Sequence, residues 1–155
     1  MTRRRVVVTG MGMVSPIGHS VETSWQAAIA GLSGIRMNEG FDTEAFGVKI
    51  CGNVVDFDIS EYMNPKEARR MDGFIQLGMA AATQAIKDAG LESHEVSQEG
   101  TGLIMGSGGP STKNLLIAFD TARNSSAKKV GPFMVPRTMS STNSATLATA
   151  FKIKG

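Results

Sequence analysis

The chain has 155 residues, which is enough to bury one hydrophobic core and form one domain. Hydrophobic residues make up 41% and charged residues 19%, a composition that is typical of globular proteins and excludes a disordered chain. The net charge of +2 is too small to indicate nucleic acid as a partner, and no apolar run approaches the roughly 18 residues of a membrane span.

Residues 3–18 predict a buried strand followed by a tight turn. The three valines at 6–8 have no polar face, which is typical of a strand covered on both sides in a parallel sheet. Gly10 and Gly12 then allow a turn at the carboxyl end of the strand, where ligands bind in open α/β sheets. Residues 102–111 repeat this shape, so we expect two neighbouring parallel strands.

A helix and a short strand are predicted next. Ser20 is expected to cap a helix whose apolar residues recur at helical spacing, with Gly31 at its end. Residues 48–54 alternate weakly in hydropathy and predict a short strand within an otherwise irregular stretch.

One long helix is predicted in the middle of the chain. Asn64 precedes a proline, a pairing that is typical of a helix start, and apolar residues then continue at helical spacing until Gly90. Gly73 and Gly78 weaken such a helix, so they indicate close packing against a neighbouring element.

The last third of the chain predicts two helices separated by an apolar loop. We expect the first helix around residues 115–119. Residues 131–136 are apolar but contain two prolines, which argues against a regular strand or helix there, so Phe133 and Met134 are expected on a loop that makes a contact or lies against the core. Residues 138–155 predict a helix of small residues, and because small side chains admit a close neighbour, this helix is expected to be central.

The residues by themselves contain no complete catalytic constellation. Cys51 is the single cysteine, which excludes an internal disulfide or a multi-thiolate metal site, and it is expected to pack rather than react. His19 and His94 are the only histidines and lack metal-ligand spacing. No serine lies in a Gly-x-Ser-x-Gly turn. We therefore expect no metal and no cofactor.

A dinucleotide-binding dehydrogenase is a remote alternative. Gly10 and Gly12 fit the start of the Gly-x-Gly-x-x-Gly pattern, but Ser15 occupies the third glycine position. Tyr62 and Lys66 fit the Tyr-x-x-x-Lys pattern of short-chain dehydrogenases, although the intervening proline places the tyrosine before its helix.

Basic residues gather in two places. Lys66, Arg69 and Arg70 lie at one predicted helix start, and Lys128 and Lys129 form a second pair. Such clusters favour an acidic protein or a phosphate group as partner. The alternative is a face that only solvent contacts.

Five motifs follow one another along the chain: RRVVVTGMGMVSPIG at residues 4–18, GLSGI at 31–35, FD at 41–42, KEARRMDGFIQ at 66–76 and GSGG at 106–109. Together they resemble the β-ketoacyl-[acyl-carrier-protein] synthases of bacterial fatty-acid synthesis, in register over the whole chain. Residues up to about 100 are similar to synthase II, and residues from 106 onward are similar to synthase I.

This resemblance implies an α/β, thiolase-like fold with αβαβα layers, built from two similar βα halves and usually assembled as a homodimer. Residues 1–155 match only the first half, a single incomplete domain. The family extends an acyl group held on a cysteine, using malonyl-acyl-carrier-protein in a decarboxylative Claisen condensation. Because the sequence shows neither a membrane span nor a signal peptide, the cytoplasm is the expected compartment. Because the family's nucleophilic cysteine and two histidines would follow Gly155, Cys51 is not expected to be catalytic and the chain alone is expected to be inactive.

The resemblance also implies binding residues. The positions that dock the acidic acyl carrier protein match Lys66, Arg69, Arg70, Lys128 and Lys129. Phe133 and Met134 match a loop near the acyl pocket and the dimer interface. Gly109 stands where synthase II enzymes carry an isoleucine that gates the pocket, so its path is expected to be open. A non-catalytic module that pairs with a synthase or with acyl carrier protein remains an alternative, as does the dehydrogenase.

Overall fold

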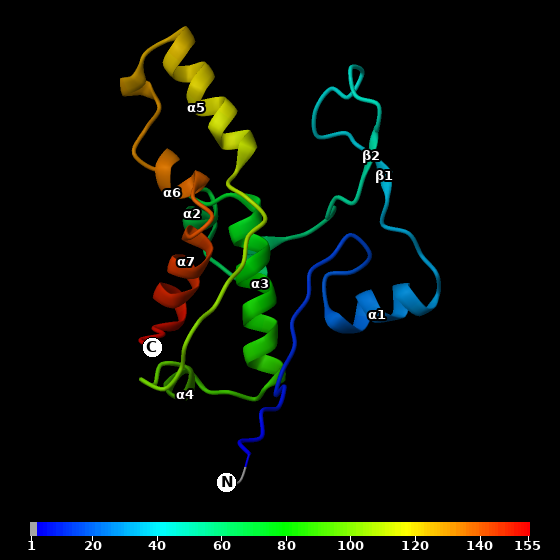
Figure 1. The fold of residues 1–155 in the computed structure, drawn as a ribbon, viewed down its shortest axis with the longest axis vertical. Coiled ribbons are helices and arrows are strands. Elements are labelled where there is room, and N and C mark those ends of the chain that lie inside the picture. The colour runs from blue at the N-terminus through cyan, green and yellow to red at the C-terminus, as the bar shows by residue number, and fades with distance from the viewer. Residues whose placement is uncertain (1–2) are drawn as a thin grey trace.

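The structure, a computed structural model, describes residues 3–155 and is rich in helices (Figure 1). Its helices are α1 (Val21–Ile29), α2 (Pro65–Ala68), α3 (Gly73–Asp88), α4 (Ser93–Val96), α5 (Thr112–Asn124), α6 (Met134–Thr138) and α7 (Thr142–Phe151). The remaining elements are two short 3₁₀ helices and an antiparallel pair of two-residue strands, namely η1 (Ile59–Glu61), η2 (Ala127–Lys129), β1 (Arg36–Met37) and β2 (Ile50–Cys51).

The core lies between α3 and α7, which run side by side in Figure 1. Ile75 of α3 and Leu147 of α7 are fully buried. The helices approach so closely that a Cβ atom built on Gly78 would lie 2.4 Å from Oδ1 of Asn143. This contact confirms that the small-residue helix is central and that Gly78 serves close packing. The same expectation for Gly73 is wrong, because no atom lies within 4 Å of the position its Cβ would take.

The N-terminal segment passes along the other side of α3. The backbone N–H of Met11 donates to Asp88 Oδ2 (2.9 Å), and that of Met13 donates to Gln84 Oε1 (3.1 Å). A Cβ atom on Gly12 would lie 1.9 Å from the carbonyl oxygen of Ala81. The glycine therefore permits close contact with a helix, and Gly12 and Gly10 do not have the positive φ that favours glycine in turns.

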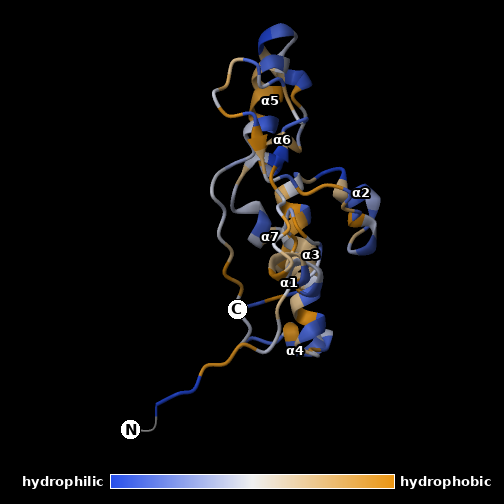
Figure 2. Ribbon diagram, turned by 90° about the vertical axis from the view of Figure 1, so that its right-hand side faces the viewer, coloured by the Kyte–Doolittle hydropathy of each residue, from blue (hydrophilic) through white to orange (hydrophobic). Residues whose placement is uncertain are grey.

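The predicted pair of parallel strands is not formed in the described residues. Residues 6–8 lie outside any strand and are 66–93% exposed, and Ile104 is 98% exposed. Figure 2 shows the apolar part of the N-terminal segment extending away from the helices. A strand needs a partner for its N–H and C=O groups, and β1 and β2, the strands of the described chain, pair only with each other.

The predicted long helix is divided into α2 and α3. Asn64 caps α2 as expected, and the helical run stops before Gly90, whose φ is +67°. The division falls at Asp72, whose side chain accepts a hydrogen bond from the backbone of Phe74 and so starts a new helix.

The predicted loop over residues 131–136 is also wrong, because α6 begins at Met134 and contains Pro136. Proline is tolerated there since the N–H groups of a helix's first turn have no intrahelical acceptor. The predicted cap of α1 is confirmed: Ser20 and Thr23 form a reciprocal capping box. The apolar side of α1, however, faces solvent, with Trp25 61% and Ile29 60% exposed.

No helix in the part of the chain that the structure describes is long and apolar enough to cross a membrane.

Candidate functional site

The first basic cluster lies on α2 and at its end. Asn64 Oδ1 accepts a hydrogen bond from the backbone N–H of Lys66 (2.9 Å), and Pro65 fixes the first helical residue. Lys66, Arg69 and Arg70 are all exposed. The local sequence thus builds a rigid turn whose three cations remain in contact with water.

One carboxylate joins the starts of α3 and α5. Asp72 Oδ2 accepts hydrogen bonds from Ser111 Oγ and from Asn114 Nδ2. Both donor residues are only 8% exposed. The backbone N–H of Ser111 in turn donates to the carbonyl of Thr138 at the end of α6 (3.1 Å). We call these residues the Asp72 cluster: Asp72, Ser111, Asn114 and Thr138.

A second set of contacts joins α2 to α6. Cζ of Arg70 lies 4.9 Å from the ring centroid of Phe133, within the range of a cation–π interaction. The Arg137 guanidinium donates a hydrogen bond to the carbonyl oxygen of Arg69. The residues just after α2 thus contact the start and the body of α6, and we call this pair of contacts the α2–α6 clasp.

The structure brings together part of the site that the sequence predicted. Arg70 and Phe133 meet in the clasp, and Met134, the first residue of α6, is half-buried. Lys128 and Lys129 are exposed on η2, which lies in Figure 1 at the far end of the arm formed by α5 and α6. The two basic clusters are therefore on different parts of the molecule.

Gly109 lies on an exposed loop that leads into α5. It lines a cleft of about 390 Å³ together with Asp72, Phe74 and Ser111. No atom lies within 4 Å of the position that a Cβ on Gly109 would occupy. The space beside this residue is open.

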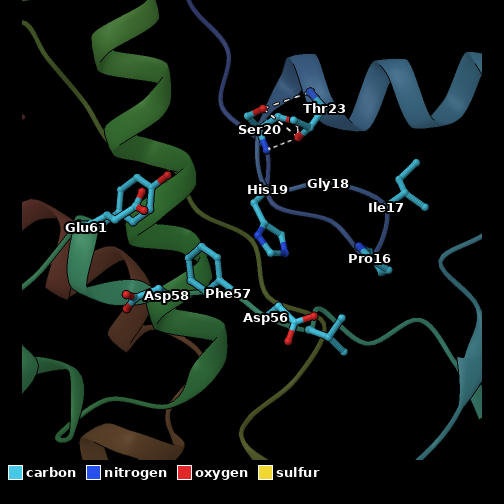
Figure 3. A pocket seen from close by; sticks show the side chains of 12 residues that line it. Pro16, Ile17, Gly18, His19, Ser20, Thr23, Asp56, Phe57, Asp58 and Glu61 are labelled. Carbon is cyan, nitrogen blue, oxygen red and sulfur yellow. Dashed lines mark hydrogen bonds between the residues drawn. The ribbon is translucent and has the colours of Figure 1, made fainter.

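A different cleft, of about 550 Å³, was not indicated by the sequence (Figure 3). The His19 ring packs edge-on against Phe57, with ring centroids 5.4 Å apart, and Asp56 and Asp58 lie on either side of Phe57. The pKa of the Asp58 carboxyl is below its ordinary value because Ser60 donates hydrogen bonds to the charged form. The backbone N–H of Ser60 contributes most and its hydroxyl contributes less.

The structure does not support a metal site or a cysteine-based site in the described residues. Within residues 3–155, no three His, Cys, Asp or Glu side chains are grouped as metal ligands. Cys51 lies partly exposed on β2.

The dehydrogenase pattern has a structural explanation instead. Gly10 and Gly12 fit against the backbone of α3. Tyr62 precedes α2, as its proline predicted, and its hydroxyl accepts a hydrogen bond from Gln84 Nε2 (3.1 Å). These residues have packing roles that do not require a nucleotide.

Residues 3–155 match the family model for the N-terminal domain of β-ketoacyl synthases, and the chain belongs to this family. It is 46% identical over 139 residues to a Vibrio cholerae 3-oxoacyl-[acyl-carrier-protein] synthase 2. This alignment covers 90% of the chain and 34% of the relative. The chain thus spans about a third of the length of that relative.

Solved structures of ketosynthases share the fold. The ishigamide ketosynthase/chain length factor matches with a TM-score of 0.87 at 27% identity, over 98% of this chain and 38% of its own. A type II polyketide ketosynthase, solved in complex with its acyl carrier protein, matches with a TM-score of 0.77 at 21% identity, over 98% and 40%. The helix-rich α/β backbone therefore corresponds to part of a thiolase-like fold, as the resemblance implied.

Proposed function

We propose that this chain is part of a 3-oxoacyl-[acyl-carrier-protein] synthase, which extends an acyl group by decarboxylative Claisen condensation with malonyl-acyl-carrier-protein. The observation that carries this proposal is the 46% identity to the Vibrio cholerae synthase over 90% of the chain. The enzyme would act in the cytoplasm as a homodimer, with residues 1–155 forming one incomplete domain.

Acyl carrier protein is proposed to dock at two basic clusters, which lie on separate parts of this molecule and are together called the docking surface. Lys66, Arg69 and Arg70 lie on and after α2, and Lys128 and Lys129 lie on η2. All five side chains are exposed, so their charges can attract an acidic partner before contact. A complex of a related ketosynthase fold with its acyl carrier protein supports a carrier as the partner.

The proposed acyl pocket involves Gly109, Phe133 and Met134. The open space beside Gly109 supports an unobstructed path, because a branched side chain there would project into that space. None of the residues in this chain is assigned a catalytic role, and Cys51 on β2 is proposed to be structural. On this proposal, the chain by itself binds carrier and forms no carbon–carbon bond.

The docking proposal is tested by reversing charge on α2. The double variant Lys66→Glu/Arg69→Glu should weaken binding to a holo-acyl carrier protein at least tenfold, or about 1.4 kcal/mol, because like charges then oppose the acidic carrier. The loss should shrink at high salt, which screens exposed charges. Isothermal titration calorimetry measures both effects.

Lys87→Glu is the matched control, because Lys87 is equally exposed but lies in the last turn of α3. It should bind carrier nearly as well as the parent chain. Equal affinity of the double variant and the parent would refute the docking surface. If the chain binds carrier but condensation never depends on it, the non-catalytic module becomes the better description.

A further inference from the structure

We propose that Phe133 is a positioning residue for carrier binding, which holds the guanidinium of Arg70 in the orientation that an acidic partner needs. The inference rests on the proposed docking function. It gives Phe133 a role on the docking surface, whereas the family resemblance places this residue at the acyl pocket.

One side of the Arg70 guanidinium contacts the Phe133 ring, and the other side is available to a partner. Cζ of Arg70 lies over the Phe133 ring, 4.9 Å from the ring centroid, so the ring covers the cation from one side. The N–H donors of a guanidinium lie in its plane and point outward from its edges. A carboxylate or phosphate can therefore bind to donors on the side that the ring leaves open.

The contact with the ring also restricts the motion of Arg70. A long exposed arginine loses side-chain entropy when it binds a partner. The ring reduces this loss, because the cation is already confined before the partner arrives. Lysine is not equivalent to arginine in this arrangement. Its ammonium group can also lie over an aromatic ring, but it has no planar set of donors that the ring could hold in one orientation.

The position of the ring is itself fixed from the α6 side. Arg137 donates to the carbonyl of Arg69, and the carbonyl of Thr138 accepts from the backbone of Ser111. The first contact holds α6 beside the end of α2, and the second holds it against the start of α5. Phe133, at the start of α6, is 46% exposed, so its ring lies at the surface where Arg70 and a docking partner can meet.

A double-mutant cycle on the whole 155-residue chain tests the inference. Affinity for a holo-acyl carrier protein is measured by fluorescence anisotropy for the parent, Phe133→Leu, Arg70→Ala and the combination. We expect Phe133→Leu to weaken binding about threefold in the parent, a loss typical of an exposed cation–π contact, and to have no effect when Arg70 is alanine. Phe133→Tyr keeps an aromatic face and should restore the parent affinity.

Two further variants keep the test independent of folding. Arg70→Lys leaves residue 133 intact and keeps the charge, yet it should lose about as much affinity as Phe133→Leu. Val135→Ala, at an exposed neighbouring position on α6, should not change binding. Circular dichroism confirms that each variant retains the helical content of the parent.

The outcomes distinguish this inference from the docking proposal. Equal effects of Phe133→Leu with and without Arg70 would overturn the positioning role and leave the docking surface intact. Parent-like binding by Arg70→Lys would do the same. If the parent chain does not bind carrier at all, both the docking surface and the positioning role are overturned.

Discussion

Asp72 connects the starts of two helices, since its carboxylate caps α3 and accepts hydrogen bonds from Ser111 and Asn114 at the start of α5. Replacing it with alanine removes a cap and leaves two buried donors without their acceptor. We expect Asp72→Ala to lower the free energy of unfolding by about 2 to 4 kcal/mol. Urea denaturation followed by circular dichroism measures this change.

Asp120→Ala provides the comparison for Asp72, because Asp120 is an exposed carboxylate on α5. Its replacement should change stability by less than about 0.5 kcal/mol. A similar small effect for Asp72→Ala would show that the cluster is not a stabilising junction.

A pH effect is expected at Asp58. Ser60 donates two hydrogen bonds to the charged Asp58 carboxylate and thereby lowers its pKa. The bond from the Ser60 backbone N–H has the larger effect and the bond from its hydroxyl the smaller one. Because the folded-state pKa is below the unfolded one, the contribution of Asp58 to stability is present above the ordinary value of about 3.9. It is lost as the pH falls through the lowered folded-state pKa.

Ser60→Ala removes the hydroxyl bond to Asp58 but keeps the backbone bond. The pKa of Asp58 should therefore rise part of the way to its ordinary value. A titration of the Asp58 carboxyl carbon by NMR measures it. An unchanged pKa would mean that the hydroxyl does not stabilise the charged form.

At the scale of elements, the contact of the N-terminal segment with α3 depends on glycine. A methyl group on Gly12 would overlap the carbonyl of Ala81. We expect Gly12→Ala to cost about 1 to 3 kcal/mol, as overpacked sites do. Gly47→Ala is the control, since no atom lies within 4 Å of its new methyl group. Thermal denaturation compares the two, and equal melting temperatures would contradict the close contact.

Local signals in the sequence were sufficient to predict several helix ends. The caps at Ser20 and Asn64 could be predicted because each side chain bonds to a backbone N–H only two or three residues further along the chain. The cap at Asp72 is local too, because Phe74 lies only two residues further on, but the bonds that hold this carboxylate to the start of α5 could not be predicted in this way. Ser111 and Asn114, whose bonds also hold this carboxylate, lie 39 and 42 residues further along the chain.

In the candidate site too, local features could be predicted from the sequence and contacts between distant residues could not. The exposed cations of α2 follow from composition and spacing, because charged side chains favour water. The contact of Arg70 with Phe133 joins residues on different helices, and no local pattern indicates it. The apolar residues 6–8 have the composition of a strand, but a strand forms only where another strand is available to pair with it.

At the scale of the whole molecule, much apolar surface is in contact with water. Residues 6–8, Trp25, Ile104 and Phe119 are each more than 60% exposed. Exposed apolar segments with unpaired backbone groups favour association. We expect the chain to self-associate at micromolar concentration, with a sedimentation coefficient that increases with concentration in analytical ultracentrifugation.

Val7→Asp should reduce this association by placing a charge in the exposed N-terminal segment. Val48→Asp adds the same charge at a similarly exposed site in another part of the chain, and it should have a smaller effect. A parent chain that remains monomeric at all concentrations would show that the exposed segments do not act as sites of association.

The contact between the N-terminal segment and α3 also sets an order of events during synthesis. The amides of Met11 and Met13 bond to side chains 77 and 71 residues further along the chain. During translation, α3 must leave the ribosome before the amides of Met11 and Met13 can bond to their acceptors on this helix. The apolar residues 6–8 therefore emerge before that partner is available, and a chaperone near the exit tunnel can bind them in the interval.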